Sequence, residues 1–91
     1  MHLEIITPER KLMSQEVDSV TLPGTEGEFQ ILNHHAPIVS TLDNGLIKLN
    51  KDVSLEEKAK AYFKEINNKL TFDIKGGVVE CKENKVIILV D

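Results

Sequence analysis

The chain has 91 residues, enough for one small domain over residues 1–91 and too few for an enzyme with a separate cofactor-binding domain. Fifteen acidic against eleven basic side chains give a formal net charge of −4. This balance argues against nucleic acid as a partner, because nucleic-acid binding depends on clustered Lys and Arg. The longest apolar run, Val86 to Val90, is far shorter than the ~20 residues of a membrane-spanning helix, so we expect no direct membrane insertion.

Short apolar stretches between turn residues are typical of a mainly β protein. In chain order we expect strands over residues 3–6, 11–13, 17–22, 28–32, 37–42, 46–49, 70–75, 78–82 and 86–90. Asn44-Gly45 is the strongest short hairpin signal and is expected to join the strands on either side of it. Gly76-Gly77 is expected to supply positive φ for a bend or bulge, and Glu83-Asn84 to form a turn. The last strand is apolar on both faces, which predicts that both are covered.

The segment 54–66 departs from this pattern. Ser54 as N-cap and Glu57 at the N3 position resemble a capping box. Apolar residues then recur at helical spacing, which favours a helix of about 11 to 13 residues that ends near Asn67-Asn68. The alternative is an extended conformation over Ala61 to Ile66, as part of a longer hairpin.

These elements predict an all-β, mainly antiparallel domain. We expect a flattened sandwich or barrel of about ten short strands with one helical insert near 54–66. Cys81 lies within a predicted strand and is expected to be a small buried apolar residue.

Catalytic and metal-binding patterns are weak in this sequence. Adjacent residues of an extended chain point to opposite sides, so His34 and His35 cannot easily bind one metal ion together, and His2 lies at the terminus. A small metal-dependent enzyme built around these three histidines therefore remains a minor alternative. The segment Gly24 to Gly27 is too short for a phosphate-binding loop and contains a carboxylate. We expect no catalytic residue, no metal site and no cofactor.

The segment from Leu22 to Ser40 carries a resemblance to a known family. It reads Leu-Pro-Gly-Thr-Glu-Gly-Glu-Phe-Gln-Ile-Leu-Asn-His-His-Ala-Pro-Ile-Val-Ser. Its Gly-Thr-Glu-Gly turn, alternating apolar residues and His-Ala-Pro motif resemble the signature of the epsilon subunit of F-type ATP synthases. The stretch Leu3 to Pro8 is similar to the opening strand of that family, and the stretches Gly76 to Glu80 and Val86 to Asp91 are similar to its last two strands.

The resemblance implies a ten-stranded sandwich that serves as a non-catalytic rotor subunit of the central stalk. Such a subunit couples the gamma subunit to the polar loops of the c-ring for proton-driven ATP synthesis. It belongs to F1 and is peripheral to the cytoplasmic side of the bacterial inner membrane. By position, the resemblance implies a c-ring interface at Glu26, Gly27, Glu28, Phe29, Gln30 and Leu32. It implies a gamma-subunit interface at Thr7, His35, Pro37 and Ser40.

Members of the resembled family typically continue into C-terminal helices that restrain ATP hydrolysis and in some cases bind ATP. The sequence stops at Asp91, so we expect it to lack these inhibitory and ATP-sensing helices. The alternative function is that of a free-standing β-sandwich interaction module unconnected to rotary motors.

Overall fold

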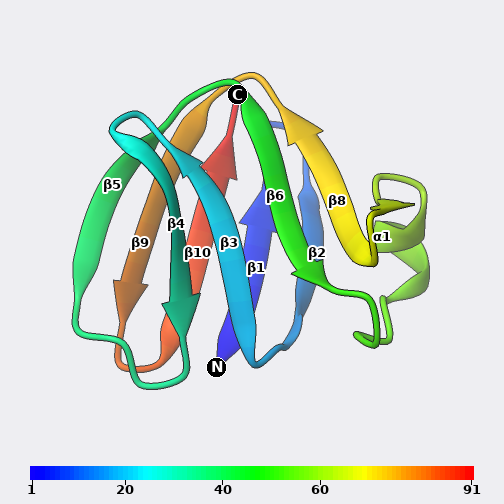
Figure 1. Ribbon diagram of the computed structural model, residues 1–91, viewed down its shortest axis with the longest axis horizontal. Coiled ribbons are helices and arrows are strands. Elements are labelled where there is room, and N and C mark those ends of the chain that lie inside the picture. The colour runs from blue at the N-terminus through cyan, green and yellow to red at the C-terminus, as the bar shows by residue number, and fades with distance from the viewer.

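Side chains of most strands alternate between a buried and an exposed face, as expected where a sheet has one face toward a core. The computed structural model describes residues 1–91 and contains ten strands and one short helix. The strands form one continuous sheet that curls into two facing layers (Figure 1). This architecture confirms the predicted mainly β sandwich or barrel of about ten strands.

The first layer contains both ends of the chain. In spatial order it consists of β2 (Lys11–Glu16), β1 (His2–Ile6), β10 (Lys85–Val90), β9 (Gly77–Lys82) and β5 (Ile38–Leu42). All neighbours in this layer run antiparallel except β1 and β10, which pair in parallel. The first and last strands therefore lie side by side in the middle of the layer (Figure 1).

The second layer is wholly antiparallel. It consists of β4 (Gly27–Leu32), β3 (Ser19–Gly24), β6 (Gly45–Asn50), β8 (Lys69–Ile74) and β7 (Lys64–Ile66). One pairing, between Gly24 of β3 and Leu42 of β5, joins it to the first layer. The sheet thus bends at the β3–β5 junction, which brings the apolar faces of the two layers together.

The core between the layers is made of nineteen buried apolar residues. Val79 and Ile88 from the first layer and Leu22 and Ile47 from the second are fully buried. Burying one such side chain contributes ~1.5–3 kcal/mol, so the facing layers hold each other in place.

The helix α1 (Glu57–Lys60) has only four residues, so the predicted helix of 11 to 13 residues is wrong in length. No side chain caps its first turn. Instead, the Glu56 carboxylate accepts a 2.8 Å hydrogen bond from the backbone N–H of Ser14, and the Glu56 backbone N–H donates to the Gln15 side chain at 3.0 Å. Through these hydrogen bonds the segment covers the free edge of β2. No helix of this chain has the length and apolar character needed to cross a membrane.

Residues 64–66 form strand β7, which agrees with the extended alternative for this part of the chain. Asn67 and Asn68 both have positive φ, 51° and 64°, and connect β7 to β8 through a two-residue turn. Two consecutive left-handed residues match the twist of an antiparallel pair, so this asparagine pair is a hairpin turn and not a helix end.

Asn44-Gly45 does not form the predicted hairpin, because β5 and β6 are not paired with each other. β5 pairs with β9 and β3, whereas β6 pairs with β3 and β8. Gly45 has no positive φ, but a Cβ there would lie 2.7 Å from the Cβ of Pro23. Close approach between neighbouring strands, not turn geometry, thus explains the glycine.

Gly76 and Gly77 also lack the predicted positive φ. A Cβ on Gly77 would overlap the backbone carbonyl oxygen of Leu89 and lie 3.2 Å from the Cα of Val90. Gly77 therefore permits β9 and β10 to approach each other closely at this end of the sheet. The turn predicted at Glu83-Asn84 is confirmed, with positive φ at both residues.

Glu4 is a buried carboxylate on the outer face of β1. Its Oε2 atom lies 3.4 Å from the Nζ of Lys11 and 3.9 Å from the Nζ of Lys85, with His2 Nε2 at 3.3 Å. Burial alone raises the pKa of Glu4, but the hydrogen bonds to Lys11 and His2 and the charges of both lysines outweigh it. The pKa therefore lies below its ordinary value of 4.5.

Replacing Glu4 with glutamine is expected to lower the free energy of unfolding by about 1 kcal/mol at pH 7. A lowered folded-state pKa contributes stability that is present above 4.5 and is lost as pH falls through the folded-state value. Urea unfolding at pH 7 and below pH 3 should thus show a difference between wild type and variant only at the higher pH. Glu65→Gln, at an exposed residue without an ion pair, is the matched control and should show no difference. An equal loss from Glu4→Gln at both pH values would contradict the ion-pair explanation.

Candidate partner-binding surfaces

The β3–β4 hairpin carries the residues that the resemblance assigns to a c-ring interface. Gly24 and Gly27 pair across a two-residue turn, and Gly27 has a φ of 124° that favours glycine. Thr25 braces the turn against β5, because its backbone N–H donates to the Thr41 carbonyl at 3.2 Å and the two threonine hydroxyls lie 2.9 Å apart. The hairpin tip is thus fixed to the first layer.

The structure divides the six predicted c-ring residues into three groups. Glu26 in the turn and Gly27 at the start of β4 are both exposed. Glu28, Gln30 and Leu32 are exposed and share one face of β4, because alternate residues of a strand point the same way. Phe29 lies on the opposite face and is packed against the core. Five of the six residues are therefore available to a partner, and Phe29 supports the hairpin from within.

Lys48 on β6 orders the exposed face of β4. Its Nζ atom lies 2.9 Å from Oε2 of Glu28, and both side chains are partly exposed. An exposed pair of this kind adds little to stability, but it restricts where the Glu28 carboxylate points. Sequence reasoning missed Lys48, because the pairing of β3 with both β4 and β6 brings it close to Glu28 only in the folded chain.

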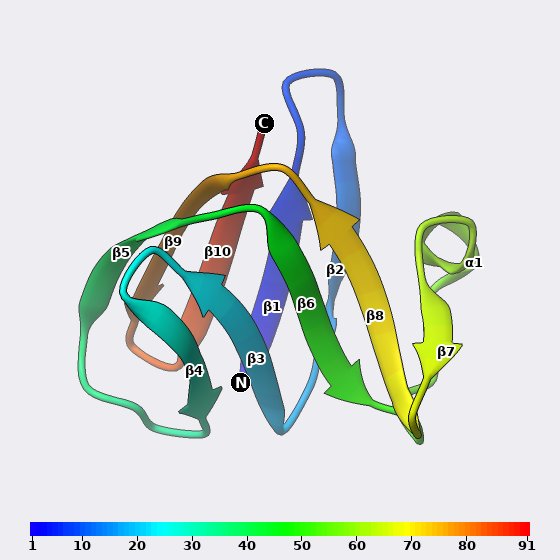
Figure 2. The same cartoon turned by 45° about the horizontal axis from the view of Figure 1, so that its top comes forward.

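The four predicted gamma-interface residues do not form one cluster. Pro37 directly precedes β5, Ser40 lies within it, and His35 is in the exposed β4–β5 loop. Thr7 follows β1 at the other end of the first layer, where the β1–β2 turn projects (Figure 2). The Thr7 hydroxyl donates to the Arg10 carbonyl at 3.1 Å, so it also shapes that turn. A partner that touches all four residues would have to span the length of the first layer.

The outer face of the first layer carries an exposed apolar patch that the sequence pattern does not predict. Val39 on β5, Val78 on β9 and Leu89 on β10 are 71%, 38% and 50% exposed. Val78 lies directly opposite Leu89 in the register, and Val39, which lies opposite Glu80, is diagonal to Val78. The prediction that both faces of the last strand are covered is therefore wrong for this chain, since only the face toward the core is buried. Gathered exposed apolar residues of this kind mark protein interaction sites.

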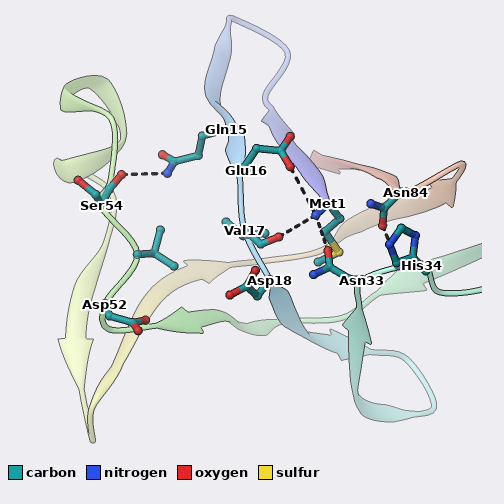
Figure 3. A pocket seen from close by; sticks show the side chains of 11 residues that line it. Met1, Gln15, Glu16, Val17, Asp18, Asn33, His34, Asp52, Ser54 and Asn84 are labelled. Atoms are coloured by element: carbon teal, nitrogen blue, oxygen red, sulfur yellow. Dashed lines mark hydrogen bonds and ion pairs between the residues drawn. The ribbon is translucent and has the colours of Figure 1, made fainter.

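The largest hollow of the molecule lies between the end of β2, the β4–β5 loop and residues 52–54 (Figure 3). It is open, measures about 580 Å³ and is lined mainly by polar residues, with His34 at its margin. Met1 lies at its base, where the backbone amino group donates to the Val17 carbonyl at 3.0 Å and to the Asn33 side chain. Small-molecule sites are usually enclosed and largely apolar, so this hollow does not have their character.

The histidine side chains that could take part in catalysis or metal binding make contacts within the chain instead. His2 contacts Ser14, Glu4 and Glu16, and the ring of His35 lies 2.6 Å from the Ala36 carbonyl. No group of three His, Cys, Asp or Glu side chains is placed to hold a metal ion. Cys81 is buried, and burial raises the pKa of its thiol, which keeps it protonated. The prediction of a buried Cys81 is confirmed.

Comparison with known proteins finds a family and close relatives. Residues 1–91 match the family described as the ATP synthase, Delta/Epsilon chain, beta-sandwich domain. The chain is 43% identical over 89 residues to the ATP synthase epsilon chain of Maridesulfovibrio salexigens. The aligned region covers 98% of this chain and 53% of the relative. It is 40% identical over 91 residues to the ATP synthase epsilon chain of Campylobacter curvus. This aligned region covers 100% of this chain and 60% of the relative. It thus spans little more than half the length of these relatives.

Two solved structures share the fold. One is a chain in the central stalk and c-ring structure of the Tetrahymena thermophila mitochondrial ATP synthase, with a TM-score of 0.74 and 18% identity over 99% of this chain and 62% of that one. The other is a chain of the Euglena gracilis mitochondrial ATP synthase, with a TM-score of 0.71 and 23% identity over 97% of this chain and 48% of that one. The fold and the family match over residues 1–91 agree, and this chain belongs to the ATP synthase delta/epsilon chain β-sandwich domain family.

Proposed function

We propose that this chain is a non-catalytic rotor subunit in the central stalk of an F-type ATP synthase, where it joins the gamma subunit to the c-ring. It is part of F1 and lies peripherally on the cytoplasmic side of the bacterial inner membrane. The names of its relatives, ATP synthase epsilon chains, support this role. The likeness in fold to a chain of the Tetrahymena central stalk and c-ring structure is in keeping with it.

The observation that carries the proposal is the exposed apolar patch formed by Val39, Val78 and Leu89. A domain of this size has little apolar surface to spare from its core, so exposing three large aliphatic residues on one face favours a permanent protein partner. Pro37, expected at the gamma interface, lies two residues before Val39 in the chain, whereas Ser40 points to the opposite face of β5, the side of the buried Val79. We assign this face and the adjoining loop with His35 to gamma.

The c-ring contact is assigned to the exposed side of the β3–β4 hairpin. Glu26 and Glu28 give it negative charge, while Gln30 and Leu32 extend it with a polar and an apolar side chain. Such a surface fits a loop with basic or amide side chains, because charge complementarity sets the orientation of a contact. The bracing of the hairpin by Thr41 and Lys48 supports a role in transmitting torque.

Replacing Val39 with lysine tests the gamma assignment. Val39 lies opposite Glu80 on β9, so a lysine there gains an ion pair and the fold should be retained. We expect affinity for an F1 complex that contains gamma and lacks this subunit to fall about tenfold or more, because a charge replaces buried apolar contact. Surface plasmon resonance measures this.

The matched control is Ile66→Lys, which places the same charge on an exposed apolar residue of the distant strand β7. It should bind as tightly as the wild type. Equal affinity of Val39→Lys and wild type would refute the assignment of this face. Failure of the wild-type chain to bind F1 at all would refute the proposed function and favour a free-standing interaction module.

A further inference from the structure

The β4–β5 loop contains the His-Ala-Pro motif, yet its own strands do little to hold it. β4 and β5 are not paired with each other, so the loop does not close a hairpin. Residues 33–37 are all exposed. His34 has a φ of 63°, in the left-handed region that non-glycine residues seldom adopt. Only one backbone hydrogen bond lies within the loop, from the N–H of His35 to the carbonyl of Leu32 at 3.2 Å.

Two residues far away in the chain make further contacts with the loop: the Met1 amino group donates to the Asn33 side chain, and Asn84 holds the backbone of His34. Oδ1 of Asn84 accepts a 2.7 Å hydrogen bond from the backbone N–H of His34 (Figure 3). Asn84 lies in the tight turn between β9 and β10 and has a φ of 59°. Its carbonyl oxygen also accepts a 3.1 Å hydrogen bond from the backbone N–H of His2. One turn residue thus connects the loop to the start of β1.

Asparagine suits both requirements of this position. Its short side chain tolerates the left-handed conformation that a two-residue hairpin turn requires. Its amide oxygen accepts from a backbone N–H that would otherwise have only water as a partner. A longer or β-branched side chain would not combine the turn with the contact.

We propose that Asn84 is a positioning residue that presets the β4–β5 loop for the gamma subunit. The inference rests on the proposed function, in which His35 and Pro37 meet gamma. Ordering a free loop on binding costs affinity, so a loop held in place beforehand binds more tightly. Asn84 itself need not touch gamma for this effect. The contact acts through the backbone of His34, which directly precedes His35 in the loop.

The test compares Asn84→Gly with Asn84→Asp. Glycine adopts positive φ without strain, so Asn84→Gly keeps the turn and removes only the acceptor. Asn84→Asp keeps a side-chain oxygen at the same place and tolerates the same backbone conformation. We expect Asn84→Gly to bind the F1 complex that lacks this subunit about five- to tenfold more weakly, with a thermal midpoint close to wild type. Asn84→Asp should bind nearly as the wild type does.

Amide hydrogen exchange of the free chain reports the loop without gamma. The His34 amide should exchange faster in Asn84→Gly and remain protected in Asn84→Asp, while amides in the centre of β10 are unchanged in both. Unaltered affinity or unaltered His34 protection in Asn84→Gly would overturn the inference while leaving the proposed function intact. A wild-type chain that does not bind F1 would instead overturn the proposed function, and the inference with it.

Discussion

Replacing Glu28 with lysine is expected to reduce proton-driven ATP synthesis by the assembled complex about tenfold or more, because the charge at the proposed c-ring contact is reversed. Glu28 is exposed on β4, so the fold should survive the change. The free energy of unfolding should fall by less than about 1 kcal/mol, even though the ion pair with Lys48 is lost. ATP synthesis in membrane vesicles carrying the reconstituted enzyme is the measurement.

The double variant Glu28→Lys/Lys48→Glu separates the two roles of Glu28. It restores an ion pair between β4 and β6 with the charges exchanged, and it therefore restores any stability that the single variant loses. It still presents a cation where the c-ring would meet a carboxylate, so ATP synthesis should remain low. Full recovery of synthesis in the double variant would show that Glu28 acts only within the chain. Normal synthesis in the single variant would remove β4 from the proposed interface.

Replacing Gly77 with alanine is expected to cost about 3 kcal/mol of stability, a large part of the ~5–15 kcal/mol typical of a domain. The added methyl group would overlap the backbone carbonyl of Leu89, and neither β9 nor β10 can move away without disturbing its pairing. Both strands lie inside the first layer, with paired neighbours on each side. Urea unfolding followed by circular dichroism measures the loss.

The neighbouring glycine provides a matched control. A Cβ on Gly76 would lie 2.9 Å from Oδ2 of Asp91, the end of a flexible side chain. Gly76→Ala should therefore cost less than about 1 kcal/mol. If Gly77→Ala cost as little stability as Gly76→Ala, β9 and β10 would not lie as close together at Gly77 as the structure shows.

Much of the fold can be predicted from the residues because each strand carries its own alternation. Phe29 and Ile31 face inward and alternate with exposed residues along β4, and the turn at Glu83-Asn84 lies where the sequence places it. The predicted helix near 54–66 is too long because the apolar residues of this segment fit either a helix or a strand. Asn67-Asn68 decides between them, since two left-handed residues in succession close a hairpin.

Glycines were the other source of error. Asn44-Gly45 is a strong local hairpin signal, but local signals do not tell which strands pair. Here β5 and β6 lie in different layers, and the glycine is needed where the backbone passes Pro23. The need for glycine at position 77 likewise comes from β10. Gly77 lies directly opposite Val90 in the sheet, although the two residues are well separated in the chain.

The candidate surfaces also divide into those that local sequence patterns reveal and those that depend on the pairing of strands. The charged hairpin around Glu28 can be found in the sequence, because turn residues and alternation are local properties. Lys48, Asn84 and the patch of Val39, Val78 and Leu89 become visible only once the strands are paired. Each depends on contacts between residues far apart in the chain, which no local pattern encodes.

By itself the sequence determined that this short acidic chain is mainly β and that it resembles the epsilon subunit, since both depend on composition, alternation and motif order. Only the tertiary structure decided which faces of the strands stay exposed and what holds the loops that carry the motifs. The physical reason is that burial and hydrogen bonding depend on which strands lie next to each other. The sheet passes from one layer to the other at the β3–β5 pairing, and the faces that meet across the core become the buried ones.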